Sequence, residues 1–183
     1  MTTRRIAVIV GSLRKESFNR TLAQRFVERA PDTLALHILE IGDLPLYNPD
    51  LEAAVPAPWA RFRQAVEETT AVLFVTPEYN RSIPGALKNA LDVGSRPYGH
   101  SVWQGKPAAI VSVSPGAIGA FGANHHLRQP LVFLNMPTMQ QPEAYVGNVE
   151  TLLEDGVLKN EGTRAFLKTF ADAFAEWIEK TKA

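Results

Sequence analysis

The residues best suited to bind an anion stand close together near the N-terminus, in residues 11–19. Ser12, Ser17 and Asn19 have short side chains that can hydrogen-bond, and Arg14 has a planar guanidinium that pairs well with phosphate. If a helix begins here, its free N–H groups favour an anion in the same space. The segment predicts a phosphate site, although a polar loop with a serine or asparagine helix cap would have the same composition.

A second polar segment, Pro77-Glu-Tyr-Asn80, follows a short apolar run. The proline removes one backbone donor and fixes the turn, so that the next backbone groups can face the edge of a ligand. A planar ring with donors and acceptors on one rim, such as that of a flavin, suits such a loop, and Tyr79 can stack on it or line it. Arg81 follows, and we hypothesise that it grips the phosphates of a nucleotide. The alternative is a plain strand-to-helix turn with a surface tyrosine and a solvated arginine.

A third segment, residues 114–119, reads Ser-Pro-Gly-Ala-Ile-Gly, and its glycines allow close approach of a ligand to the backbone. His125 and His126 are adjacent, so on a helix they point in different directions, whereas helical metal ligands stand four residues apart. We therefore predict no metal site. The chain has no cysteine and no Gly-x-Ser-x-Gly, so no catalytic side chain is assigned.

Strand-like and helix-like segments alternate along the whole chain. Continuous apolar runs predict buried strands at residues 6–10, 72–75 and 108–113, and further strands are predicted at 34–41 and 136–139. Apolar residues at helical spacing, or a helix-starting proline, predict helices at 18–26, at 59–69, from Pro84, at 120–134 and over a stripe from Phe166 to Ile178. Pro130 must bend or break the fourth helix. We interpret the stripe as core packing.

Alternation of this kind requires a parallel sheet with helices on both faces and right-handed crossovers. The prediction is an α/β fold, a flavodoxin-like three-layer sandwich whose five-stranded parallel sheet has the order 2-1-3-4-5. In such sheets the ligand lies beyond the carboxyl ends of the strands, where the order reverses. The three polar segments follow the first, third and fourth predicted strands, which is the place this rule requires. We predict one domain over residues 1–183.

The bulk properties favour work on small molecules. The 183 residues carry a formal net charge of zero, whereas nucleic-acid binders are usually basic and flavodoxin-type electron carriers usually acidic. The sequence contains no run of about 18 apolar residues, so no membrane span is predicted. The N-terminus lacks the pattern of a signal peptide, and the absence of cysteine suits a cytoplasmic location.

The ordered set of motifs resembles the NADPH-dependent FMN reductase family, which includes flavodoxin-like quinone, chromate and azo reductases. The matching residues are Gly11-Ser-Leu-Arg14 with Ser17 and Asn19, Pro77-Glu-Tyr-Asn80, Pro84-Gly85, Leu87-Lys-Asn-Ala90, Asp92, Ser95-Arg96-Pro97, His126-Leu-Arg-Gln129 and Leu131-Val-Phe-Leu134. The resemblance implies that one group of residues holds the FMN phosphate: Ser12, Leu13, Arg14, Ser17, Phe18 and Asn19. It implies that Pro77, Glu78, Tyr79 and Asn80 border the flavin ring, and that Ser114 and Gly116 close its third side.

By the same resemblance, NADPH or NADH would reduce the FMN, and a quinone, azo compound, chromate or free flavin would take the electrons in a ping-pong mechanism. Such chemistry belongs to the cofactor and needs no catalytic side chain. Two departures stand out: Val93 follows Asp92 where relatives often have an aromatic residue, and Arg81 replaces a tyrosine or a small residue. The alternatives are a flavodoxin-like electron carrier and a flavin-binding regulatory protein.

Family members form dimers or tetramers, so we expect a homodimer or homotetramer. Arg128, beside the apolar residues 131–134, is the expected contact, and a two-fold pairing would suit this helix. The alternative is a core-facing helix with one exposed arginine.

Overall fold

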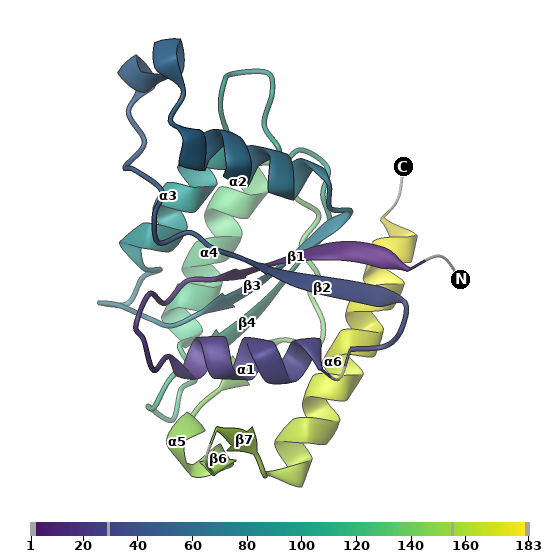
Figure 1. Cartoon of the computed structure of the whole chain (residues 1–183). Coiled ribbons are helices and arrows are strands. Elements are labelled where there is room, and N and C mark those ends of the chain that lie inside the picture. Colours follow the sequence, from purple (N-terminus) through teal and green to yellow (C-terminus); the bar gives the residue numbers. More distant parts are fainter. Residues whose placement is uncertain (1–2, 29, 155, 182–183) are drawn as a thin grey trace.

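A sheet of five parallel strands forms the centre of the protein (Figure 1). The computed structural model describes residues 3–28, 30–154 and 156–181. The strands are β1 (Arg4–Val10), β2 (Leu34–Leu39), β3 (Ala71–Thr76), β4 (Ala108–Val113) and β5 (Ala144–Val146). Their order is β2-β1-β3-β4-β5, and all four pairings are parallel. The predicted order is therefore confirmed.

Helices cover both faces of the sheet (Figure 1). One face is covered by α1 (Phe18–Val27) and α6 (Glu161–Lys180), and the other by α2 (Ala57–Glu67), α3 (Gly85–Gly94) and α4 (Phe121–Phe133). The smaller elements are a 3-10 helix η1 (Pro49–Ala54), a short helix α5 (Val149–Leu152) and an antiparallel pair, β6 (Leu153–Glu154) with β7 (Val157–Leu158). These layers make the predicted sandwich.

Strand β1 contributes to two hydrophobic cores because its side chains alternate between the faces of the sheet. Ile6, Val8 and Val10 pack in the core under α1 and α6. Ala7 and Ile9 pack in the core under α2, α3 and α4. A strand buried on both faces reads as a continuous apolar run, which is why the sequence showed it clearly.

The apolar stripe of α6 packs in the first of these cores. Phe170, Phe174 and Ile178 are buried, and the ring of Phe170 lies 6.1 Å from that of Phe26 in α1. The interpretation of the stripe as core packing is confirmed.

The predicted fifth strand was placed wrongly. Residues 136–139 make only one isolated bridge, between Thr138 and Ala108 at the start of β4. The strand that extends the sheet is β5, which pairs with Val111, Ser112 and Val113 further along β4. Three residues are too few to give a periodic signal, whereas residues 136–139 resemble an apolar run because Met136 and Met139 are buried for other reasons.

Helix α4 continues through Pro130 to Phe133, so of the two expected effects, a bend or a break, the break does not occur. Helix α3 begins at Gly85, and Pro84 stands one residue before its first turn.

The departure at Val93 is compensated by packing. Val93 is fully buried, and the fully buried Trp103 lies against Gly94, where an added Cβ would come within 2.6 Å of the indole ring. A tryptophan from a later segment therefore fills the space beside the end of α3.

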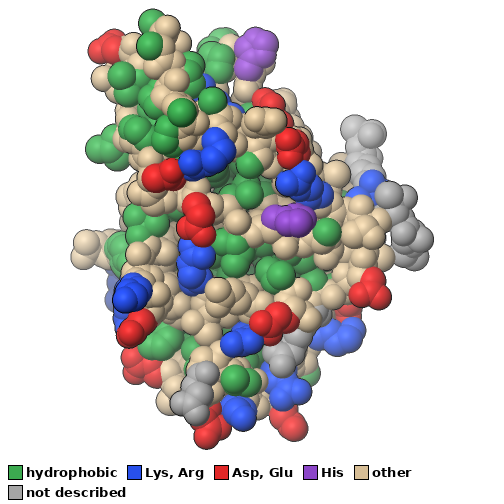
Figure 2. All heavy atoms as spheres, viewed as in Figure 1, with side chains coloured by type: hydrophobic (Ala, Val, Ile, Leu, Met, Phe, Trp, Pro, Cys, Tyr) green, Lys and Arg blue, Asp and Glu red, His purple; other side chains and the backbone are tan. Residues whose placement is uncertain are grey.

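Positive and negative side chains are interspersed over the face seen in Figure 2, in line with the net charge of zero. Apolar side chains gather on the projecting segment around η1, where Leu46, Leu51 and Val55 are exposed. Within the described ranges, no helix combines the length and apolar character needed to cross a membrane.

Candidate functional site

Three loops meet at the carboxyl edge of the sheet: loop one (residues 11–19), loop two (77–82) and loop three (114–119). They follow β1, β3 and β4, which are neighbours. The strand ends are level because Val10 pairs with Val75 and Thr76 with Ser112. A Cβ at Gly11 would lie 3.1 Å from the Thr76 hydroxyl oxygen and 3.4 Å from the Pro77 ring, so loops one and two touch. The structure thus brings the predicted segments together.

Loop one contains a buried polar cluster. Ser12, Ser17 and Asn19 are only 6%, 3% and 5% exposed. The Ser17 hydroxyl caps α1 by accepting from the Arg20 N–H at 3.3 Å, so the capping interpretation is correct for this residue. The amide oxygen of Asn19 is buried and has no hydrogen-bond partner among the described residues. A buried polar atom without a partner is unusual and marks a place where a ligand group can bind.

The rim of loop one carries Leu13 and Arg14. Leu13 is 55% exposed. The guanidinium carbon of Arg14 lies 5.3 Å from the centre of the Phe18 ring, within range of a cation–π contact. In the described part of the chain Arg14 forms no ion pair, so its charge is available to an anion at the start of α1.

Loop two forms a small hairpin that the sequence reading did not predict. The N–H of Tyr79 donates to the Ser82 carbonyl at 2.9 Å, and the N–H of Ser82 donates to the Tyr79 carbonyl at 3.0 Å. Asn80 and Arg81 between them have φ values of 52° and 64°, which is typical of a type I′ turn. Asparagine tolerates this region, but an arginine there is strained. Asn80 was the signal from which the turn could have been predicted.

The side chain of Glu78 turns from loop two toward α4. Its carboxylate accepts from the Ala123 N–H at 3.0 Å and from the Arg81 guanidinium at 3.0 Å. The side chain of Glu78 is only 12% exposed, whereas that of Arg81 is 75% exposed. Glu78 therefore contributes its backbone to the edge of the site while its carboxylate binds the neighbouring helix. Tyr79 is half-exposed at the same edge.

Loop three is shaped by its own hydrogen bonds and by β5. The Ser114 hydroxyl donates to the Gly116 carbonyl at 3.0 Å, and the Ser112 hydroxyl donates to the Gly119 carbonyl at 2.7 Å. Gly119 has a φ of 60°, and a Cβ there would lie 2.6 Å from the carbonyl carbon of Tyr145. Loop three therefore presents its backbone, and Ser114 uses its hydroxyl internally.

The two histidines of α4 have different partners. His125 Nε2 lies 2.9 Å from the Tyr145 hydroxyl, and His126 Nδ1 lies 2.7 Å from the Ser82 hydroxyl in loop two. Burial, with a hydrogen bond to Glu143, raises the pKa of Tyr145 to about 12. The histidines thus connect α4 to β5 and to loop two.

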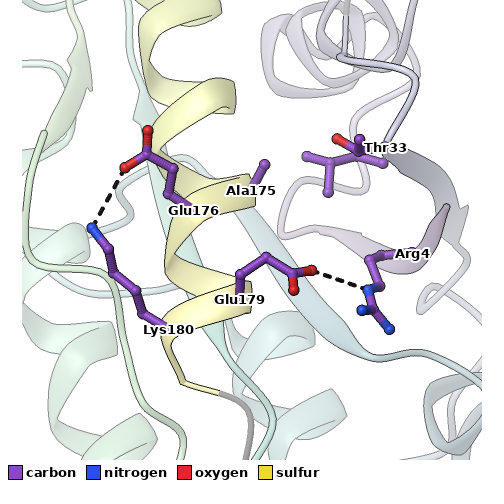
Figure 3. A pocket seen from close by; sticks show the side chains of 7 residues that line it. Arg4, Thr33, Ala175, Glu176, Glu179 and Lys180 are labelled. Atoms are coloured by element: carbon purple, nitrogen blue, oxygen red, sulfur yellow. Dashed lines mark hydrogen bonds and ion pairs between the residues drawn. The ribbon is translucent and has the colours of Figure 1, made fainter. Parts of the chain in front are cut away.

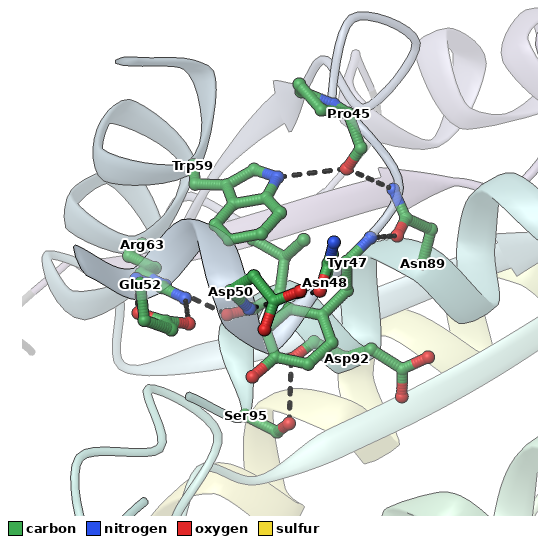
Figure 4. Close-up of polar contacts among 11 residues, drawn as sticks. Pro45, Tyr47, Asn48, Asp50, Glu52, Trp59, Arg63, Asn89, Asp92 and Ser95 are labelled. Atoms are coloured by element: carbon green, nitrogen blue, oxygen red, sulfur yellow. Dashed lines mark hydrogen bonds and ion pairs between the residues drawn. The ribbon is translucent and has the colours of Figure 1, made fainter. Parts of the chain in front are cut away.

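Part of the matched motif near residue 89 has a structural role that the sequence reading did not assign. The Asn89 amide group donates to the carbonyls of Leu44 and Pro45 at 3.1 Å and accepts from the Tyr47 N–H at 2.8 Å (Figure 4). The Trp59 indole donates to the same Pro45 carbonyl at 2.9 Å. Asn89 therefore fixes the long connection after β2 against α3.

A groove of about 420 Å³ lies far from the three loops, between the amino ends of β1 and β2 and the end of α6 (Figure 3). Its charged residues pair with one another, Arg4 with Glu179 at 3.2 Å and Lys180 with Glu176 at 3.5 Å. Ligands of doubly wound sheets bind at the opposite edge. We therefore place the candidate site at the loops and not in this groove.

Comparisons with known proteins show the family to which the chain belongs. Residues 4–151 match the family model described as NADPH-dependent FMN reductase, and the chain belongs to this family. The structure is similar to that of a flavodoxin from Pseudomonas aeruginosa, with a TM-score of 0.55 and 18% identity, over 93% of this chain and 98% of that chain. This similarity shows the flavodoxin-like fold.

Two relatives are much more similar. A quinone reductase from Pseudomonas putida is 63% identical over 179 residues, which cover 97% of this chain and 96% of the relative. The solved structure of FerB from Paracoccus denitrificans, a flavoenzyme NAD(P)H:(acceptor) oxidoreductase, has a TM-score of 0.92 and 46% identity and covers 98% of this chain and 99% of that chain.

Proposed function

We propose that this chain, as one domain, binds FMN at loops one, two and three and passes electrons from NADPH or NADH to a quinone. The observation that carries the proposal is the partnerless amide oxygen of Asn19 inside a buried polar cluster at the start of a helix. Family membership and the printed activities of the two relatives support it.

The residues of loop one fit a phosphate group. The hydroxyls of Ser12 and Ser17 and the amide NH2 of Asn19 would donate hydrogen bonds to the phosphate, the first N–H groups of α1 would face the anion, and Arg14 would neutralise its charge. The partnerless amide oxygen of Asn19 can only accept, so it would accept from a hydroxyl group of the bound cofactor and not from the phosphate. Leu13 and Phe18 would provide the apolar sides of the same binding loop. Bound FMN would supply the hydride and electron chemistry of the reaction.

Loops two and three would border the ring with backbone groups. Pro77, Glu78, Tyr79 and Asn80 would lie along one edge, and Ser114 and Gly116 along another. Tyr79, Ile118 and Phe121 are each about half-exposed beside these loops, and an exposed apolar rim suits a flat quinone ring. The nucleotide and the acceptor would use this space in turn, which gives ping-pong kinetics. Azo compounds, chromate and free flavin are further acceptors we propose to test.

The test is to purify the protein, measure its bound FMN and follow NADPH and NADH oxidation with benzoquinone. We expect a yellow protein that oxidises the nucleotide continuously only when quinone is present, with parallel lines in double-reciprocal plots. Bound flavin without turnover on any acceptor would favour the regulatory alternative. Flavin that is reduced only by a separate reductase would favour the carrier.

We propose, second, that Arg81 binds the phosphates of NAD(P)H. It is strained and 75% exposed, and Glu78 engages it through one nitrogen at 3.0 Å. Strained residues cluster at functional sites, where the surrounding structure holds them in place. We expect Arg81→Ala to raise KM for the nucleotide about tenfold while kcat for benzoquinone reduction stays the same. An unchanged KM for both NADPH and NADH would contradict this role.

We propose, third, that the chain forms a homodimer or homotetramer through the end of α4. Val132 and Phe133 are 75% and 86% exposed, and the nearby Tyr98 is 90% exposed. Exposed apolar surface of this kind usually marks an interface. Arg128, the contact expected from the sequence, is half-buried, and its guanidinium donates to the Asn124 side chain and to the Met139 carbonyl. Light scattering of Phe133→Glu should show a smaller particle than the wild type.

A further inference from the structure

Helix α4 begins without a cap of its own. Its N-cap residue is Ala120, which is in the left-handed region (φ 59°) and provides no side-chain hydrogen bond, and its first turn contains no acidic residue. The first N–H groups of a helix have no partner within the helix and are usually satisfied by a capping side chain. For α4 this role falls to Glu78, whose carboxylate accepts from the N–H of Ala123, the third residue of the helix.

Gly122 makes room for this contact. A Cβ at this position would lie 2.9 Å from the Glu78 carboxylate oxygen and 3.3 Å from the Arg81 carbonyl oxygen. Glycine lowers helix stability by about 1 kcal/mol relative to alanine. Its presence in the first turn of α4 is therefore explained by the close approach of loop two.

A second contact joins the same parts, because the Ser82 hydroxyl lies 2.7 Å from His126 Nδ1, one turn further along α4. The hairpin of loop two is thus attached to α4 at both of its ends, at Glu78 and at Ser82. Loop three leads directly into Ala120 and the first turn of α4. The position of loop two relative to loop three is consequently set through the start of this helix.

We infer that Glu78 is a positioning residue: by capping α4 from loop two, it holds the two ring-side loops at the separation that the flavin ring requires. This rests on the proposed function, since it presupposes that the ring lies between these loops. Glu78 acts through Ala123 and does not itself react. Its pairing with Arg81 is a separate contact, made by the other carboxylate oxygen.

The experiment titrates FMN and riboflavin into the flavin-free protein and follows flavin fluorescence. Riboflavin lacks the phosphate, so its affinity reports the contacts of the ring and its ribityl chain without those of the phosphate. We expect Glu78→Ala to weaken the affinity for FMN and for riboflavin about tenfold each, so that the ratio of the two affinities stays unchanged. Glu78→Gln should restore binding to within about twofold, because its amide oxygen can still accept from the Ala123 N–H.

Two further variants control the result. Gly122→Ala should displace the carboxylate and weaken both flavins about as much as Glu78→Ala, although alanine favours the helix more than glycine does. It also serves as the test if Glu78→Ala does not fold. Glu28→Ala removes a glutamate whose side chain pairs with Arg25 three residues earlier and makes no contact with the start of a helix, and it should leave both affinities unchanged.

The outcomes separate this inference from the proposed function. Wild-type protein that binds neither flavin would overturn both. Wild-type binding together with unchanged affinity in Glu78→Ala and Gly122→Ala would overturn the positioning role alone. Equal losses in Glu78→Gln and Glu78→Ala would also overturn it, because charge and not the cap would then be responsible.

Discussion

Loop one and loop two touch each other, but they are unfavourable for stability in different ways. Loop one buries an amide oxygen of Asn19 that has no partner among the described residues. Loop two keeps Arg81 in a left-handed conformation with a φ of 64°. The first is a polar penalty that a bound group can remove by hydrogen bonding, and the second is a backbone penalty that persists whether or not a ligand is bound.

The difference also concerns what holds each loop. Loop one is fixed locally, by its own helix cap at Ser17. Loop two is fixed from a distance, by α4 through Glu78 and Ser82. We therefore expect changes in loop one to affect the phosphate and free-state stability, and changes in loop two to affect the ring and the nucleotide.

The largest expected effect is on binding of the FMN phosphate. Arg14→Ala should weaken the affinity for FMN about 10- to 100-fold, because it removes a charge-assisted contact. The affinity for riboflavin, which has no phosphate, should stay almost unchanged. Fluorescence titration of the flavin-free protein measures both. Arg20→Ala is the matched control, since this arginine of α1 is already paired with Glu40. Equal losses for FMN and riboflavin would show that Arg14 does not bind the phosphate.

A change at Asn19 should separate stability from binding. Asn19→Leu keeps the branched arrangement of side-chain heavy atoms and removes the buried partnerless oxygen, so the free energy of unfolding of the flavin-free protein should rise by about 1 kcal/mol. Urea unfolding measures this. The additional stabilisation by FMN should fall, because binding is weaker. A lower stability of the flavin-free variant would mean that the amide has a partner in solution, such as water.

Relief of strain in loop two should have a smaller effect. Arg81→Gly removes a left-handed penalty of about 1 kcal/mol and loses an exposed ion pair of about 0.5 kcal/mol, so unfolding should cost about 0.5 kcal/mol more. Arg81→Ala keeps a Cβ in the same conformation and serves as the control. The glycine variant should exceed the alanine variant in urea midpoint, and the reverse order would argue against a strained turn.

The last expected effect concerns Tyr145 beside loop three, and it is absent near neutral pH and appears only at high pH. Burial and the contact with Glu143 raise its pKa from 10.0 to about 12, so the folded protein holds the phenol proton more tightly than the unfolded chain. This contribution to stability is complete below pH 10 and is lost as the pH rises through 10 to 12. Tyr145→Phe should flatten that part of the pH profile of unfolding. Tyr98→Phe, at a residue that is 90% exposed, should not.

Sequence reasoning predicted what depends on local pattern. The continuous apolar runs identified β1, β3 and β4, and the rule for doubly wound sheets then placed the three loops at one edge. The short strand β5 was missed because three residues are too few to show a period. Residues 136–139 resembled a strand because their two methionines are buried in the core.

The contacts that organise the site were harder to foresee. Glu78 meets Ala123 and Asn89 meets Pro45 across more than forty residues of chain, and no spacing rule connects such pairs. Gly122 was a usable signal, since a glycine in a first helical turn invites the question of what approaches it. The compensation of Val93 by Trp103 likewise depends on tertiary packing alone.

The shortness of β5 also limits how copies of this chain can associate. Exposed strand edges can pair with another chain and extend a sheet, which is a common route to aggregation. Here the last strand offers only three residues. At the start of β4 the same edge is occupied, because the Ala108 N–H donates to the Pro137 carbonyl and the Ala108 carbonyl accepts from the Met139 N–H. Copies that meet on this side would therefore have little backbone to pair with, and their association would depend on side-chain contacts and not on an extended intermolecular sheet.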